Sequence, residues 1–258
     1  TYTATSVSVE TWYRAVVTSG ACASAYTTSV KLTPLSAATA GTISGTNEIC
    51  TGTASTLTLN GYVGSITWQK ATVTAGVVGT YASVTGANAE TFSTGALTAT
   101  TSYRAQVTIG TCSTVYTSGD YIVTVDKATV AGTAAVNETT PVLTVCAYGS
   151  KSLKLTGNTG TIQWQSSTTS ATSGFTNVTG ATSTPYTFAN ITTNTWYRAV
   201  VTSGVCTSVN SNVIAITVSQ PADAGTLDIT AGSFNDSVCS GSASSLTLNN
   251  YSTYGTIV

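Results

Sequence analysis

The chain has 258 residues, enough for about two domains. Only 7% of them are charged, eight basic against nine acidic, so no basic patch exists to neutralise nucleic-acid phosphates. Histidine, the commonest general base and metal ligand, is absent, and no apolar run is long enough to cross a membrane. Since 41% of the residues are hydrophobic, we expect a folded chain despite its low charge.

One block of residues recurs along the chain every 90 to 96 residues or so, which is the size of one immunoglobulin-like sandwich. The period predicts part of a repeat at 1–38, complete repeats at 39–128 and 129–221, and the first part of another at 222–258. Because two repeats are incomplete, we expect an internal segment of a longer protein. The recurring residues are Tyr13-Arg14, Tyr103-Arg104 and Tyr197-Arg198, each followed by a Gly and a Cys, and Trp68-Gln69 and Trp164-Gln165.

The repeat at 39–128 reads as short strands separated by turns. Apolar and polar residues alternate in each strand, and Asn60-Gly61 and Thr85-Gly86-Ala87 are typical turns. Residues 71–80 are expected to be a loop or a weak edge strand. No segment has helical periodicity, so we predict an all-β chain of tandem immunoglobulin-like antiparallel β-sandwich repeats of about 90–96 residues. The expected strands are Ser55 to Asn60, Ser65 to Lys70, Tyr81 to Val84, Ser102 to Thr108 and Tyr121 to Val125.

Aromatic residues mark the predicted core. Alternation turns Trp68 and Trp164 inward, together with Tyr13, Tyr103 and Tyr197. The tyrosines occupy a position like the tyrosine corner of such folds, where the hydroxyl reaches a backbone group. We therefore predict structural roles for all five residues.

Two tryptophans and three arginines are predicted to face outward. Trp12 and Trp196 directly precede the inward tyrosines, so they are candidates for surface contact with a sugar ring or a neighbouring chain. The alternative is local packing over the aliphatic part of the nearby arginine. The arginines are expected to be cross-strand partners on the solvated face of the sheet, and they are Arg14, Arg104 and Arg198.

Six cysteines occupy two positions of the repeat and indicate disulfides, hence an oxidising compartment. The favoured pairing lies within repeats, because the late cysteine is expected at the end of its sandwich far from the next repeat. It joins Cys50 to Cys112 and Cys146 to Cys206, and leaves Cys22 and Cys239 without partners in this sequence. The alternative lies between repeats, as Cys22–Cys50, Cys112–Cys146 and Cys206–Cys239.

No set of residues predicts catalysis or a cofactor. Ser150-Lys151 could form a serine–lysine dyad, but the lysine is expected on a solvated face. The acidic residues are scattered, and Asn235-Asp236 is a thin candidate for calcium. We therefore predict no enzyme activity, no cofactor and no metal site.

The repeats resemble the immunoglobulin-like repeats of very large Bacteroidota surface proteins. The likeness rests on Gly-Ser-Ile-Thr-Trp-Gln at 64–69, Val-Thr-Gly-Ala at 84–87 and the pattern Tyr-Arg-Ala-x-Val-Thr-x-Gly-x-Cys. Such proteins are typically exported by the type IX system, and some are gliding-motility adhesins. The resemblance implies a secreted protein at the bacterial cell surface.

These observations predict a non-enzymatic stalk segment of a large extracellular adhesin or surface filament. Two other functions stay open, an array of carbohydrate-binding modules and a self-assembling surface-layer or filament subunit. The expected partners are neighbouring repeats of the same chain, and surface glycans or other copies in a filament. Nucleic acid and membrane insertion of this segment are not expected.

Overall fold

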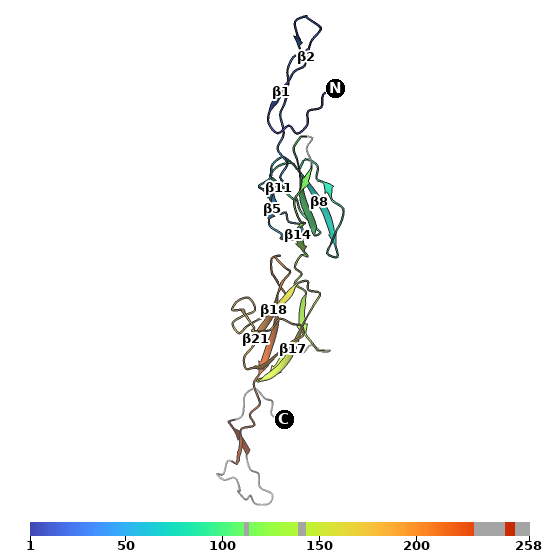
Figure 1. Cartoon of the computed structure of the whole chain (residues 1–258). Helices are drawn as coiled ribbons and strands as arrows, with labels where there is room; N and C mark the ends of the chain where they lie inside the picture. The colour runs from blue at the N-terminus through green and yellow to red at the C-terminus, as the bar shows by residue number, and fades with distance from the viewer. Residues whose placement is uncertain (111–113, 139–142, 230–245, 251–258) are drawn as a thin grey trace, which may run out of the picture. The chain divides into compact units, whose positions relative to one another are not determined.

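The computed structural model describes residues 1–110, 114–138, 143–229 and 246–250. None of these residues lies in a helix, and they form two compact units, Thr1–Asp126 and Lys127–Val258. Each unit contains one complete sandwich of two sheets, labelled around β8 and β18 in Figure 1. The structure thereby confirms the predicted all-β, immunoglobulin-like sandwich.

The first sandwich pairs a small sheet, in the order β11-β7-β5, with a larger sheet in the order β10-β8-β12-β14-β6. Its strands pair antiparallel, except that β14 runs parallel to β6. The two short strands β9 and β13 pair with β8 and β12. The strands are β5 (Thr42–Gly45), β6 (Glu48–Cys50), β7 (Thr56–Asn60), β8 (Ser65–Thr74), β9 (Val77–Val78), β10 (Ala82–Ser83), β11 (Thr91–Ser93), β12 (Thr101–Thr108), β13 (Val115–Tyr116) and β14 (Tyr121–Asp126).

The second sandwich has the same plan, with sheets in the orders β15-β17-β20 and β16-β23-β21-β18-β19. Here β16 and β23 form the parallel pair, and β22 pairs with β21. The strands are β15 (Thr133–Val136), β16 (Thr144–Cys146), β17 (Gly149–Thr156), β18 (Thr161–Ser167), β19 (Thr176–Asn177), β20 (Tyr186–Ile191), β21 (Thr195–Thr202), β22 (Val209–Asn210) and β23 (Ile214–Ser219).

Shorter pairs of strands occupy the two ends of the chain. Tyr13 lies opposite Val30, as Tyr103 lies opposite Tyr121 in the first sandwich. Near the other end, Leu227 lies opposite Leu248. The strands are β1 (Thr11–Tyr13), β2 (Val16–Val17), β3 (Ala25–Tyr26), β4 (Val30–Leu32), β24 (Thr226–Ile229) and β25 (Leu246–Asn249).

Alternation of apolar and polar residues decides which face of each strand is buried. In β12, Tyr103 and Val107 are fully buried, whereas Arg104 and Gln106 stay partly exposed. The equivalent strand β21 alternates in the same way. One face of each large sheet therefore covers the core, as the period of two in the sequence predicts.

Residues 71–80 differ from the expected loop or weak edge strand. Strand β8 continues to Thr74 and folds back onto β9. The turn residues Ala75 and Gly76 both have positive φ, 50° and 79°, which is typical of the tight turn whose twist matches two paired strands. This hairpin was not predicted because its turn contains Ala-Gly, whereas the residue pairs that usually indicate such a turn are Asn-Gly and Asp-Gly.

Candidate functional sites on the repeats

The recurring tryptophans lie in the two sandwich cores. Trp68 and Trp164 have no exposed surface. Trp68 donates its indole N–H to the Ala89 carbonyl at 2.9 Å, and Trp164 donates to the Ser183 carbonyl at 3.0 Å. Because their N–H groups are hydrogen-bonded inside the repeat, these two side chains have structural roles.

The recurring tyrosines are buried beside other aromatic rings. The Tyr103 ring centroid lies 5.7 Å from that of Phe92, and Tyr197 stacks on Phe188 at 4.7 Å. Both Tyr103 and Tyr197 are buried, whereas Tyr13 is only half-buried. Burial raises the pKa of Tyr103, and it raises the pKa of Tyr197 further, with a smaller contribution from Tyr186.

The hydroxyl of Tyr103 does not make the bond expected of a tyrosine corner. It is the one buried side-chain polar atom without a hydrogen-bond partner in the described part of the chain. The nearby Thr94 hydroxyl moderates the rise in pKa, while it donates to the Gly95 carbonyl and accepts the Ser55 N–H at 2.9 Å. The hydroxyl that does reach a backbone group belongs to Tyr121, which donates to the Gly45 carbonyl at 2.6 Å.

The arginine of the first sandwich is held between two aromatic rings. The guanidinium carbon of Arg104 lies 4.1 Å from the centroid of Tyr81 and 4.4 Å from that of Tyr116. Its Nε donates to Gln69, the residue opposite it on β8, at 2.8 Å. Stacking and a cross-strand hydrogen bond together fix the side chain on the sheet.

Other polar groups tie Tyr81 into this outer surface. Its hydroxyl bonds to Asp120 and lies 2.6 Å from the Ser102 hydroxyl. Burial, and then the bond to Asp120, raise the pKa of Tyr81. Ser102 has no exposed surface, so the position that bears Trp in the other repeats is covered here.

The second sandwich repeats the same contact with different residues. The Arg198 guanidinium lies 4.1 Å from the Phe175 ring centroid, and its Nε donates to Gln165 at 2.8 Å. In the N-terminal strands, Arg14 lies 4.4 Å from the Tyr26 centroid. The cross-strand glutamine could be predicted from the Trp-Gln pair. The aromatic partners also recur in register, because Tyr26 and Tyr116 each lie 12 residues after their arginine, and Tyr81 and Phe175 each lie 23 residues before theirs.

The two candidate tryptophans for surface contact differ in exposure. Trp12 is 62% exposed and faces Lys31, whose Nζ lies 5.8 Å from the indole centroid. Trp196 is half-buried, opposite Ser167 and Ala215 on the neighbouring strands. The arginines near them stack on Tyr26 and Phe175.

The cysteines contradict one of the two bonds of the favoured pairing, while the other, Cys50–Cys112, involves a residue outside the described ranges. Cys146 is an exposed free thiol, while Cys206 is disulfide-bonded, so the predicted Cys146–Cys206 bond is wrong. Cys22 is also free and Cys50 is bonded, which contradicts Cys22–Cys50 in the alternative scheme. Free Cys146 equally contradicts Cys112–Cys146, and both Cys112 and Cys239 lie outside the described residues.

No cluster resembling a catalytic or metal centre forms in the described ranges. Lys151, the candidate dyad lysine, pairs with Glu138 at 2.8 Å instead of standing free in solvent. No three acidic or cysteine side chains gather there as a metal site would require. Among the residues that the structure describes, none forms a helix long and apolar enough to span a membrane. The calcium candidate Asn235-Asp236 lies outside the residues that the structure describes.

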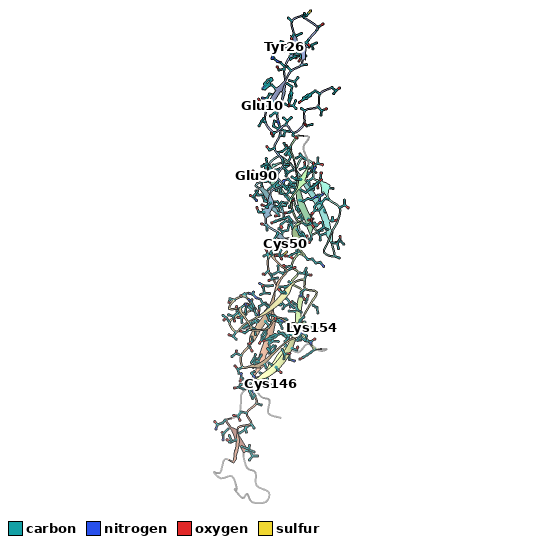
Figure 2. The ribbon with its side chains drawn as sticks, viewed as in Figure 1. Glu10, Tyr26, Cys50, Glu90, Cys146 and Lys154 are labelled. Carbon is teal, nitrogen blue, oxygen red and sulfur yellow. The ribbon has the colours of Figure 1, made fainter. Side chains whose placement is uncertain are left out.

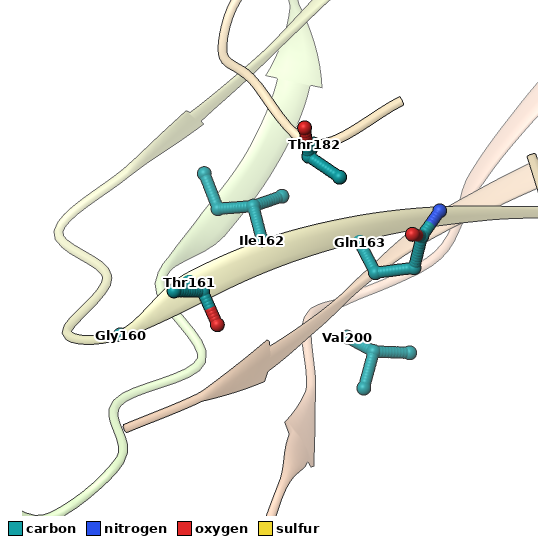
Figure 3. Close-up of a pocket in the computed structure, with 6 residues that line it drawn as sticks. All are labelled: Gly160, Thr161, Ile162, Gln163, Thr182 and Val200. Atoms are coloured by element: carbon teal, nitrogen blue, oxygen red, sulfur yellow. The ribbon is translucent and has the colours of Figure 1, made fainter. Parts of the chain in front are cut away.

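An open hollow lies beside β18 and is lined by only a few polar side chains. Figure 3 shows its lining residues, among them Thr161, Gln163 and Val200. The amide of Gln163 already donates to the carbonyls of Trp164 and Val178, at 2.9 and 2.8 Å. The hollow therefore lacks the convergent polar groups of a small-molecule site.

One protein family matches both complete sandwiches. It is described as a domain of unknown function (DUF8696), and it matches residues 39–127 and again 130–220. These matches cover more than half of the chain. No curated protein matches the sequence of this chain.

Solved structures of similar fold include bacterial adhesin and vertebrate domains. A Ca²⁺-stabilised adhesin that helps an Antarctic bacterium bind ice is 20% identical, with a TM-score of 0.35 over 86% of this chain. The chain spans about 60% of that adhesin structure. Titin domains A168–A170 are 16% identical, with a TM-score of 0.41 over 81% of this chain and 75% of theirs. Because these sequence identities and TM-scores are low, the fold is assigned from the strand order of the structure itself.

Proposed function

The chain belongs to the DUF8696 family, and on that premise we propose that its repeats form a non-enzymatic stalk segment of a large extracellular bacterial adhesin or surface filament. Residues 1–38 and 222–258 would contribute to further repeats of the same kind. In this role each sandwich adds length, and the neighbouring repeats of the same chain are its main partners.

The observation that carries the proposal is that the recurring side chains make their contacts inside their own repeat. The indoles of Trp68 and Trp164 bond to carbonyls of the same sandwich, and Arg104 and Arg198 each bond to the glutamine opposite them. An array of binding modules would be expected to repeat its binding residues. Here the repetition preserves scaffold residues, while Trp12 and Trp196 have Ser102 at the matching position.

The sequence resemblance extends this proposal to a biological setting. Likeness to repeats of giant Bacteroidota surface proteins supports export by the type IX system and a place on the cell surface, as in gliding-motility adhesins. Disulfide-bonded Cys50 and Cys206 fit an oxidising, extracellular environment.

An exchange experiment in the protein that carries these repeats tests the role of spacer. Residues 39–220 are replaced by two unrelated immunoglobulin-like sandwiches of equal length, and in a second variant they are deleted. A spacer predicts that the exchange preserves surface adhesion and that the deletion reduces it. Loss of adhesion in the exchange variant, as in the deletion, would show that these repeats carry the binding surface.

The carbohydrate-binding alternative has its own readout. Trp12 has the most exposed of the four indole rings, so it is the best candidate for stacking on a sugar ring. A glycan array with the chain and its Trp12→Ala and Trp196→Ala variants is expected to show no binding that depends on either residue. Binding lost in one of the variants would favour the alternative over the stalk.

A further inference from the structure

We propose that the first sandwich binds a primary carboxamide, the side chain of an asparagine or glutamine from a partner protein, in a groove along the outer edge of β5. The groove is lined by residues of β5 and of the loop 117–121, and its volume is about 260 Å³. The second sandwich fills the same place with a carboxamide of its own, from Asn212. This inference goes beyond the proposed function, because it concerns what one repeat recognises and not what the repeats hold apart.

In the second sandwich, Asn212 caps the edge strand β15. Its Oδ1 accepts the N–H of Ala134 at 2.8 Å, and its Nδ2 donates to the carbonyl of the same residue at 2.9 Å. Strand β15 is the outermost strand of its sheet, so no neighbouring strand of that sheet supplies these two bonds. One amide therefore satisfies both backbone groups of an edge residue.

The equivalent residue of the first sandwich is Ile43. It lies opposite Leu59, and Ala134 lies opposite the matching Leu155. Leu59 donates its N–H away from β5, at 3.0 Å to the carbonyl of Glu90, which is labelled in Figure 2. In an antiparallel pair, two facing residues either exchange both of their hydrogen bonds or exchange none. Ile43 therefore points its own N–H and carbonyl outward, as Ala134 does.

The loop that faces this edge is anchored in the same way in both sandwiches. Ser211 and Thr117 each donate their N–H to the facing alanine carbonyl, of β21 and of β12, at 2.8 and 3.0 Å. The next residue is Asn212 in the second sandwich and Ser118 in the first. In the described ranges, no side chain bonds to the N–H or the carbonyl of Ile43. The groove thus lacks the amide that the second sandwich supplies.

The open edge of β5 is one residue long. Gly45, the next residue along β5 that faces outward, gives its carbonyl to the Tyr121 hydroxyl at 2.6 Å. On the other side, Gly41 has a φ of 75° and lies before the strand begins. A partner strand needs several outward groups in a row. A single amide needs only the two that Ile43 presents.

The chemistry of the groove favours a neutral amide over a carboxylate. An amide offers both an acceptor and a donor, whereas a carboxylate cannot donate to the carbonyl of Ile43. Asp120 also lines the groove, and its charge disfavours a bound anion. The remaining N–H of a primary amide has oxygen atoms of Asp120 and Ser118 as acceptors within the same lining.

Native-state hydrogen exchange of the whole chain tests whether the edge is open. Relative to the rate in an unfolded peptide, the Ala134 amide is expected to exchange about fivefold or more slowly than the Ile43 amide, the factor that one net hydrogen bond supplies. Asn212→Ser is expected to remove the difference. An Ile43 amide as protected as that of Ala134 in the unaltered chain would show that the groove is closed and would overturn the proposal.

A titration with small probes tests the ligand. N-acetyl-asparagine N-methylamide is added at tens of millimolar to the isotope-labelled chain, and the NMR shift of the Ile43 amide is recorded. A shift with this probe and with its glutamine analogue, but not with the alanine and aspartate analogues, supports the proposal. The alanine analogue has the same backbone without a carboxamide. An equal shift with it would identify peptide backbone as the occupant, and that result, or no shift with any probe, would contradict the proposal.

Matched variants locate the bound probe. Ser118→Asn supplies the carboxamide from the chain itself, as Asn212 does, and is expected to abolish the probe-induced shift of the Ile43 amide. Ser118→Thr keeps the hydroxyl and is expected to leave the shift unchanged. A shift that persists undiminished in Ser118→Asn would place the probe outside the groove and count against the proposal. These measurements need no adhesion assay, so the groove and the spacer role can each fail alone.

Discussion

At the scale of single residues, the Tyr103 hydroxyl is the feature that costs stability. It lies in the first core without a hydrogen-bond partner, next to the ring of Phe92. A buried polar group without a partner costs about 1–3 kcal/mol. The recurring tyrosine is therefore kept for its ring, which fills the core, rather than for its oxygen.

We predict that Tyr103→Phe raises the free energy of unfolding of the first sandwich by about 1 kcal/mol, because it removes only the unsatisfied oxygen. Tyr121→Phe is the matched control. That hydroxyl donates to the Gly45 carbonyl at 2.6 Å, so its removal is expected to cost about 1 kcal/mol. Urea unfolding of the two variants measures both changes. A loss of stability in Tyr103→Phe would mean that the hydroxyl is bonded after all.

At the scale of strands, glycine sets how closely the small sheet approaches the turn that follows β7. A Cβ on Gly41 would lie 2.4 Å from the Asn60 carbonyl oxygen, whereas a Cβ on Gly61 would meet nothing within 4 Å. Both glycines have similar positive φ, 75° and 68°. The two positions therefore share the same backbone strain and differ in crowding alone.

This difference gives a paired prediction. Gly61→Ala is expected to destabilise the first sandwich by about 1 kcal/mol, the cost of a left-handed conformation with a Cβ. Gly41→Ala is expected to cost at least 1–3 kcal/mol more, because backbone atoms must move apart. Thermal unfolding of the two variants compares them. Equal losses would show that β5 can shift without penalty.

The sequence predicted the strands that alternate strongly and missed features that depend on neighbours distant in the chain. Trp68 and Tyr103 could be placed in the core because alternation fixes the face of each strand. The stacking of Arg104 between Tyr81 and Tyr116 was not predicted, because these rings lie just before the two-residue strand β10 and in the two-residue strand β13, where alternation is too short to assign a face. The predicted Cys146–Cys206 disulfide was wrong, because its pairing was inferred from the expected ends of one sandwich and spacing alone does not determine which cysteines are bonded.

At the scale of the whole molecule, several tyrosines couple folding to alkaline pH. Burial raises the pKa of Tyr103, Tyr121, Tyr186 and Tyr197 in the folded chain, and burial with the Asp120 bond raises that of Tyr81. In the unfolded chain each is expected near its usual value of about 10. The folded state therefore holds these protons more tightly than the unfolded state does. The stability that depends on these protonated hydroxyls is fully present below about pH 10 and is lost as the pH rises through the folded-state pKa values.

We predict that the free energy of unfolding falls steeply as the pH rises above about 10, towards the raised values of the folded state. Each tyrosine still protonated in the fold is expected to contribute a slope of about 1.4 kcal/mol per pH unit. Urea unfolding at a series of alkaline pH values, with phenolate absorbance recorded alongside, measures the slope. In Tyr197→Phe the slope for the second sandwich should decrease by one such increment, because that ring packs on Phe188 and its removed hydroxyl no longer titrates. A stability that is unchanged between pH 10 and 12 would show that these hydroxyls ionise as readily in the fold as in the unfolded chain.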